Sequence, residues 1–246
     1  AQSVPENYVR KQTMRNAERY ITAELAELET RVLSAQEDKI RLESEMFLEL
    51  RETISEHRSR LMDIATAVAR LDVFCGLAEV AHRLHYRRPL VDASDKLELI
   101  GARHPVIERM LGPGEFIPND IKLTTSNRQI LVITGPNMAG KSTMIRQTAL
   151  IQLMAQAGSF VPVERAHIGV CDRIFTRVGA SDNIARGEST FMVEMKETAA
   201  ILTQATQRSF VILDEIGRGT STYDGVSIAW AVVEYLHDRI GCRTLF

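Results

Sequence analysis

The sequence has few of the features that mark secreted, metal-binding or membrane-spanning proteins. Its three cysteines, Cys75, Cys171 and Cys242, are scattered without metal-ligand spacing, so free or buried thiols in a reducing cytosol are the better interpretation. No apolar run approaches the length of a membrane span, and no signal-peptide pattern opens the chain. These absences predict a soluble protein of the cytoplasm.

A strong positive charge is also absent. The formal net charge is −2, so the chain has no overall basic field that would attract nucleic acid. This argues against tight DNA binding by the chain alone. Apolar residues are plentiful, at 45% of 246 residues, which is sufficient for a real core in one large or two modest domains.

Glycine is nearly absent before Pro89, and the organisation of the sequence changes there. Between Ile21 and Leu71 apolar residues recur at helical spacing, which predicts amphipathic helices, two of them antiparallel with a turn near 34–38. The Glu, Arg and Lys residues that lie densely between these apolar positions could be mistaken for a DNA-binding surface. Mixed-sign charge along a helix is usually a solvated face, which is the preferred interpretation.

After Pro89 short apolar strands alternate with turns and helices, as in an α/β nucleotide-binding domain. The predicted strands cover 97–100, 130–133 and 210–213. The predicted helices cover 142–157, 194–204 and 225–237.

The most informative segment is 131–143, LVITGPNMAGKST, where a β-branched run leads into a glycine-bounded loop. Gly135 and Gly140 let the backbone curl so that N–H groups point inward, and the following helix N-terminus adds partial positive charge. Lys141 can reach the β- and γ-phosphates, and the Ser142 hydroxyl is suited to ligate Mg²⁺. A chance turn could contain these residue types, but the spacing and the preceding strand favour a phosphate-binding loop.

A second segment, 209–215, is an apolar strand that ends in two adjacent carboxylates. Asp214 would hold Mg²⁺ through water, and Glu215 could polarise an attacking water. Alone, this segment would be a strand followed by a solvated acidic turn. Together with the upstream loop it favours an ATPase with its own base over a kinase, so Glu215 and Lys141 are the predicted catalytic residues.

Several segments carry a family resemblance. The loop 134–143, TGPNMAGKST, resembles the Walker A loop of MutS mismatch-repair ATPases. Segment 189–195, STFMVEM, resembles that family's counterpart of the ABC signature, and 214–225, DEIGRGTSTYDG, resembles its Walker B with the following loop. Upstream, 8–13 and 16–20 are similar to the junction of the family's clamp and lever helices. The resemblance covers nearly the whole chain, as the lever and ATPase portion.

The resemblance implies an α/β fold, a P-loop (ABC-type) ATPase domain preceded by long antiparallel α-helices. Residues 1–88 would be the helical lever or clamp stem, and 89–246 the ATPase domain, truncated at its C-terminus. It implies ATP and Mg²⁺ at a dimer interface, with DNA-dependent hydrolysis in the full-length parent coupled to a DNA clamp. It also implies mismatched duplex DNA bound mostly outside this chain, a homodimer or related heterodimer, a partner of the MutL type, no membrane, and a bacterial cytoplasm near the nucleoid.

The resemblance also assigns single residues. Asn137 matches the family's γ-phosphate contact, and Phe116 matches an aromatic that stacks on adenine, although such an aromatic is more often plain packing. Ser189 matches a serine that closes on the γ-phosphate of the opposite subunit, although a Ser-Thr pair before a helix is first of all an N-cap. The resemblance also implies that the interface between the two subunits lies near Arg218, Thr220 and Ser221. The implied nucleotide-binding residues are Gly135, Pro136, Asn137, Met138, Ala139, Gly140, Lys141, Ser142, Thr143 and Phe116, with Ser142 and Asp214 for Mg²⁺.

Two rival functions stay open. An ATP-gated clasp of the chromosome-maintenance type would need coiled-coil insertions within the ATPase, whereas these helices precede it. A MutS paralogue acting in recombination would share the motifs, and a Phe-any-Glu mismatch wedge in the N-terminal sequence would decide against it. The sequence stops at 244–246, where MutS-like ATPases continue into an Ala-Thr-His segment, so we expect a piece of a longer protein.

Overall fold

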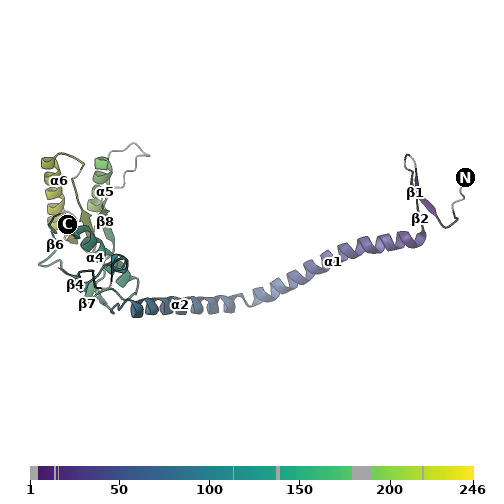
Figure 1. Cartoon of the computed structure of the whole chain (residues 1–246), viewed down its shortest axis with the longest axis horizontal. Helices are drawn as coiled ribbons and strands as arrows, with labels where there is room; N and C mark the ends of the chain where they lie inside the picture. Colours follow the sequence, from purple (N-terminus) through teal and green to yellow (C-terminus); the bar gives the residue numbers. More distant parts are fainter. Residues whose placement is uncertain are drawn as a thin grey trace. The chain divides into compact units, whose positions relative to one another are not determined.

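The computed structural model describes residues 5–13, 15, 17–112, 114–136, 139–178, 190–217 and 219–246. Contacts within the chain divide it into two compact units, Ala1–Leu71 and Asp72–Phe246. The first contains a hairpin and helices, and the second contains two larger sheets with their covering helices (Figure 1). In the described part of the chain, no helix is both long and apolar enough to cross a membrane.

The first unit joins an antiparallel hairpin to a helix through a capping residue. The Thr22 side chain accepts a hydrogen bond from the Leu25 N–H at 3.2 Å, which satisfies one of the free donors at the helix start. Every residue of the two helices is described, and none of them is buried. The elements are β1 (Val9–Thr13), β2 (Glu18–Ile21), α1 (Ala23–Glu56) and α2 (Arg58–Arg83), the last of which continues into the second unit.

The predicted turn near 34–38 is wrong, because α1 runs through these residues without interruption. Its sequence contains neither glycine nor proline to stop it. The helix ends instead at Glu56, and only its capping residue, His57, separates it from the start of α2. Antiparallel helices need a loop of roughly two to five residues to reverse the chain, so the predicted antiparallel pairing is wrong as well.

The second unit contains two four-stranded sheets. One has the order β6-β10-β9-β8 and is parallel throughout. The other has the order β3-β7-β4-β5, parallel between β3 and β7 and antiparallel elsewhere. The strands are β3 (Leu90–Asp92), β4 (Leu97–Ala102), β5 (Asn119–Leu123), β6 (Ile130–Leu131), β7 (Arg165–Gly169), β8 (Ile174–Val178), β9 (Phe210–Asp214) and β10 (Arg243–Leu245).

Helices connect these strands, as parallel pairing requires. Figure 1 shows α4, α5 and α6 gathered around β6 and β8, with β4 and β7 at the other end of the unit. All six predicted strands and helices of this half are present, with boundaries that differ by a few residues. The helices are α3 (Ile107–Met110), α4 (Lys141–Gln156), α5 (Thr190–Gln204), α6 (Thr222–Tyr235) and a short π-helix, η2 (Leu236–Ile240).

Strand β9 is buried on both faces. Phe210 and Ile212 belong to one apolar cluster, together with residues of α4. Val211 and Leu213 belong to a second cluster, together with residues of α5, α6 and η2. Because side chains alternate across a strand, these helices cover opposite faces of the parallel sheet. The core therefore fixes the end of β9, where Asp214 is the last residue of the strand and Glu215 follows it.

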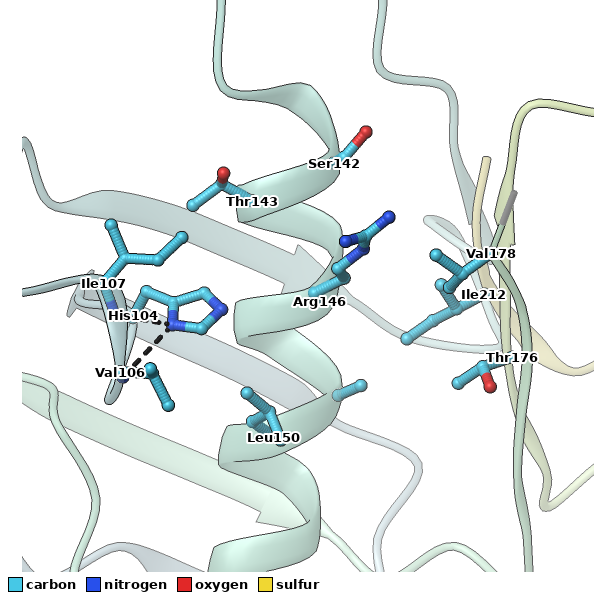
Figure 2. Close-up of a pocket in the computed structure, with 11 residues that line it drawn as sticks. His104, Val106, Ile107, Ser142, Thr143, Arg146, Leu150, Thr176, Val178 and Ile212 are labelled. Atoms are coloured by element: carbon cyan, nitrogen blue, oxygen red, sulfur yellow. Dashed lines mark hydrogen bonds between the residues drawn. The ribbon is translucent and has the colours of Figure 1, made fainter. Parts of the chain in front are cut away.

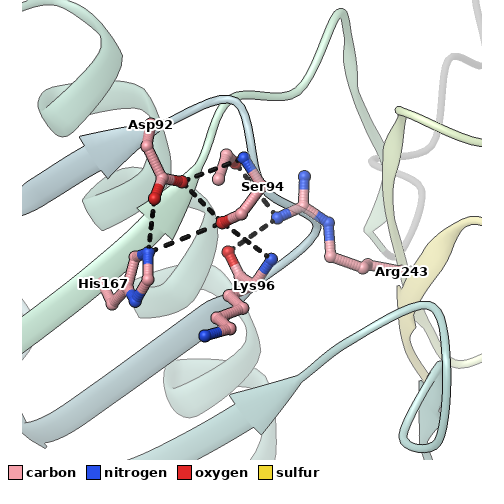
Figure 3. A network of polar contacts seen from close by, with 6 residues as sticks. Asp92, Ser94, Lys96, His167 and Arg243 are labelled. Atoms are coloured by element: carbon pink, nitrogen blue, oxygen red, sulfur yellow. Dashed lines mark hydrogen bonds and ion pairs between the residues drawn. The ribbon is translucent and has the colours of Figure 1, made fainter.

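Arg243, at the start of β10, connects the parallel sheet to the other sheet. Its side chain is buried, and its Nη1 donates to the carbonyl oxygens of Lys96 at 3.1 Å and Gly169 at 3.0 Å (Figure 3). Burial lowers the pKa of this guanidinium, because leaving water disfavours the charged form. Its hydrogen bonds to carbonyls offset part of that cost.

A polar network lies beside this arginine in Figure 3. His167 Nε2 is 2.8 Å from Asp92 Oδ2, and the Ser94 hydroxyl donates to Asp92 Oδ1 at 2.5 Å. Ser94 also lies 3.5 Å from the same ring nitrogen. In a catalytic Ser-His-Asp triad the serine and the aspartate contact different ring nitrogens. This network therefore has the geometry of a structural clasp on the turn after β3, not of a hydrolase triad.

Candidate active site

The loop before α4 has the backbone that glycine permits. Gly135 has φ 151° and Gly140 has φ 88°, values that other residues rarely adopt. Lys141 is the first residue of α4, and its Nζ donates to the Gly135 carbonyl oxygen at 2.5 Å. The lysine ammonium and the free N–H groups of the helix N-terminus therefore lie at the same loop, which is the arrangement that binds a phosphate.

Asp214, the last residue of β9, lies against the first turn of α4. The Ser142 hydroxyl donates to Asp214 Oδ1 at 2.9 Å, although the two residues are 72 positions apart. Arg146, one turn further along α4, donates from Nη2 to Asp214 Oδ2 at 3.3 Å. Asp214 is buried, so this contact holds both carboxylate oxygens in place. The two residues predicted to ligate Mg²⁺ are thus in direct contact.

Glu215 follows with a backbone conformation that is uncommon for its residue type. Its φ is 67°, in the left-handed region, and its side chain is exposed. Two residues later Gly217, at φ 87°, approaches α6 so closely that an added Cβ would lie 2.6 Å from the Gly225 Cα. The chain therefore leaves β9 through a tight loop that presents Glu215 to solvent.

A cavity of about 500 Å³ runs along one side of α4 (Figure 2). In Figure 2 His104 approaches from one flank, while Val178 and Thr176 of β8 lie on the other. Ser142 lies at one end of this row of side chains. The lining residues are His104, Val106, Ile107, Ser142, Thr143, Arg146, Ala149, Leu150, Thr176, Val178 and Ile212.

His104 holds one wall of this cavity. Its Nδ1 accepts hydrogen bonds from the backbone N–H groups of Val106 and Ile107, both at 3.2 Å. Desolvation lowers the pKa of His104, with a smaller contribution from the nearby positive charge of Arg146. A neutral imidazole can accept at Nδ1, so the lowered pKa and the two hydrogen bonds agree with each other.

The predicted site residues fall into three groups. Those in the loop, in the first turn of α4 or at the adjoining end of β9 are Gly135, Pro136, Ala139, Gly140, Lys141, Ser142, Thr143 and Asp214, and Glu215 follows Asp214 directly. Phe116 is half-buried in the segment before β5 and is not among the residues that line the cavity beside α4. Asn137, Met138, Ser189 and Arg218 lie outside the described residues.

Two residues of the site were not predicted from the sequence. Arg146 lies four positions after Ser142, so helical spacing could have placed both on the same face of α4. His104 lies in a loop far from either motif, and no pattern in the sequence indicates its role. Among the described residues, no group of three or more His, Cys, Asp or Glu could hold a metal ion.

Comparison with known proteins identifies two family matches along the chain. Residues 131–246 match MutS domain V, and residues 1–38 match MutS family domain IV. The DNA mismatch repair protein MutS of Symbiobacterium thermophilum is 58% identical over 243 residues, covering 99% of this chain and 28% of the relative. The protein of the same name from Ruminiclostridium cellulolyticum is 59% identical over 245 residues, again covering 99% and 28%.

A third relative, the DNA mismatch repair protein MutS of Salinibacter ruber, is 57% identical over 249 residues, covering 100% of this chain. The matched region makes up 27% of the length of that relative. The chain therefore spans little more than a quarter of the length of the curated relatives that it matches.

Proposed function

This chain belongs to the MutS family, and on that basis we propose that it binds and hydrolyses Mg²⁺·ATP as the ATPase portion of a DNA mismatch repair protein. The reaction is phosphoryl transfer to water. The observation that carries the proposal is the 2.9 Å contact between Ser142 and Asp214, directly beside Lys141. It places a hydroxyl and a carboxylate together at the N-terminus of a helix that follows a glycine loop.

These residues fit a Mg²⁺·nucleotide. Mg²⁺ prefers oxygen ligands and is usually held by one or two protein groups together with substrate phosphates. Ser142 and Asp214 supply such oxygens, and when bound the ion would neutralise charge on the phosphates. Lys141 would leave the Gly135 carbonyl for the phosphates, and Glu215 would accept a proton from the attacking water.

The other nucleotide contacts are part of the same proposal. The loop backbone through Pro136, Met138 and Ala139 would wrap the phosphates, and Asn137 would contact the γ-phosphate. Thr143 would contribute from the first turn of α4. Phe116 would stack on the adenine, which needs the segment before β5 to approach the loop.

Ser189 is proposed to act on the nucleotide of a second subunit, so the active unit would be a homodimer or related heterodimer. A mixture of Ser189→Ala and Lys141→Ala subunits of the full-length protein tests this. In the heterodimer one composite site would carry both lesions and the other neither, so activity should recover to about half of wild type if the sites are independent. A verified heterodimer that stays inactive would favour a plain N-cap.

The functions of the whole protein are proposals as well. We propose that it couples the nucleotide state through the helical region, residues 1–88, to a clamp on mismatched duplex DNA. A partner of the MutL type and a cytoplasmic, nucleoid-associated location belong to this proposal. The relatives are named as mismatch repair proteins, which favours repair over a recombination paralogue.

The deciding measurement is the ATPase rate of the full-length protein with and without mismatched duplex. Stimulation, or a changed rate-limiting step, with the mismatch alone supports the repair function. A rate that ignores the mismatch points to the recombination paralogue, and a protein that does not hydrolyse ATP at all contradicts the proposed function.

A further inference from the structure

Two buried charges lie behind the loop that carries Glu215. Glu194, on α5, is only 3% exposed, and its Oε1 accepts a hydrogen bond from the backbone N–H of Gly217. Its Oε2 lies 3.8 Å from Nη2 of Arg177, on β8, which is also 3% exposed. A buried carboxylate needs such partners, because desolvation of an unpaired charge is expensive.

Arg177 is itself fixed by the backbone and by a second carboxylate. Its Nη1 donates to the carbonyl oxygen of Val178 at 2.8 Å. Its Nε lies 3.0 Å from Oε2 of Glu197, a distance of an ion pair without the alignment of a hydrogen bond. Glu197 is on α5 as well, but its side chain is 53% exposed.

The loop after Glu215 is packed tightly against the helices on both sides. An added Cβ at Gly219 would lie 2.7 Å from the Phe191 Cβ on α5, and one at Gly217 would meet Gly225 on α6. The Glu194 carboxylate is the charged acceptor that anchors this loop, and hydrogen bonds to ionised acceptors are roughly twice as strong as neutral ones.

We propose that Glu194 is a positioning residue for the hydrolysis reaction, acting through Gly217 on the orientation of Glu215. The inference rests on the proposed function. Only Ile216 separates Glu215 from the anchored Gly217. Glu215 also holds a positive φ, a conformation that persists only when its surroundings enforce it.

The consequence is specific to the chemical step. Loss of the anchor lets the loop relax and shifts the Glu215 carboxylate, and a displacement of about 1 Å in a catalytic group can cost about 10²-fold in rate. Lys141, Ser142 and Asp214 are on other elements, so nucleotide binding does not depend on this anchor.

Glu197 offers a matched control. Like Glu194, Glu197 lies on α5 and pairs with Arg177. The Glu197→Gln variant therefore removes one carboxylate partner of this arginine, while the contact between Glu194 and Gly217 stays intact. The Glu194→Gln variant removes the charge that accepts the Gly217 N–H. A third variant, Glu194→Asp, keeps the charge and shortens the side chain, so it withdraws the carboxylate from Gly217 with less disturbance of the buried charge balance.

The experiment measures kcat, KM for ATP and ADP affinity in the full-length protein, with hydrogen exchange of a peptide covering 215–221. Glu194→Gln and Glu194→Asp should lower kcat about 10- to 100-fold, with KM and ADP affinity within about twofold of wild type. Their Gly217 amide should exchange faster without nucleotide. Glu197→Gln should resemble wild type in every readout.

Equal kcat values for the Glu194 and Glu197 variants would overturn the inference, as would losses of kcat and ADP affinity in the same proportion. If Glu194→Gln does not fold, Glu194→Asp decides by the same criteria. A wild-type protein without ATPase activity would instead contradict the proposed function, whereas an active wild type with an unaffected Glu194→Asp contradicts this inference alone.

Discussion

The two units of the chain differ in how far they bury apolar side chains of the same type. Leu28, on α1 of the first unit, is 52% exposed, whereas Leu99, on β4 of the second, is fully buried. The printed ion pairs of α1 lie on its surface, such as the one between Arg41 and Asp38 at 2.9 Å, and exposed pairs of this kind contribute little to stability. Apolar spacing thus predicts a helix without predicting what that helix packs against.

This difference in burial supports placing the proposed active site in the second unit. A catalytic side chain needs a fixed direction, and fixed directions come from buried partners. The second unit supplies them: β9 is enclosed by two apolar clusters and delivers Asp214 to Ser142. Nothing comparable holds a side chain on the described helices of the first unit, where no residue is buried.

The largest expected effect is at the loop of the second unit. Lys141→Ala should abolish ATP turnover and most of the nucleotide affinity, because the ammonium no longer neutralises the phosphates. Calorimetric titration with ATP and a steady-state ATPase assay measure both, and far-UV circular dichroism should be unchanged. Lys122→Ala, which removes an exposed lysine paired with Glu98 in the same unit, is the matched control. Unchanged ATP binding and hydrolysis in Lys141→Ala would contradict the site.

The next effect separates the two acidic neighbours at the end of β9. Glu215→Gln should bind ATP but hydrolyse it about 10²–10⁴-fold more slowly if Glu215 is the general base, as proposed. Asp214→Asn should instead weaken the binding of nucleotide in the presence of Mg²⁺. A titration of nucleotide with and without Mg²⁺, followed by single-turnover hydrolysis, distinguishes the two. Similar binding defects in both variants would refute the division of roles.

A pair of leucine substitutions tests the comparison of the units directly. Leu99→Ala should destabilise the second unit by about 2–5 kcal/mol, because it leaves a cavity in a packed core. Leu28→Ala should change the free energy of unfolding by no more than about 0.5 kcal/mol. Denaturant unfolding followed by far-UV circular dichroism includes the helices of the first unit, and the fluorescence of Trp230, the single tryptophan of the chain, reports on the second unit. Equal losses would show that α1 is packed in solution.

The smallest effect concerns the half-buried Asp92. The Ser94 hydroxyl, followed by His167, holds the pKa of Asp92 at about 2, below its ordinary value of 3.8. Because the folded pKa is depressed, the contribution of this carboxylate to stability is present above about pH 4 and is lost as the pH falls toward 2. The melting temperatures of wild type and Asp92→Asn should therefore differ at pH 6 and converge at low pH. A difference that does not depend on pH would contradict this.

The sequence predicted the second unit better than the first. The strand that ends at Asp214 and the helix that starts at Lys141 were confirmed, because a β-branched run, two glycines and a polar end constrain the local backbone strongly. The antiparallel helices were wrong, since a 3.6-residue period indicates which face is apolar and says nothing of where the chain reverses.

By itself the sequence determined the local backbone of the proposed phosphate loop: Gly135 and Gly140 at positions of positive φ, Lys141 at the helix start, and Asp214 at the end of an apolar strand. Only the tertiary structure decided which side chains meet there. The contact between Ser142 and Asp214 spans 72 positions, and Gly217 finds its acceptor 23 positions away on another helix. The physical reason is that local propensity acts over a few residues, whereas these contacts exist only once packing has brought a parallel sheet and its helices together.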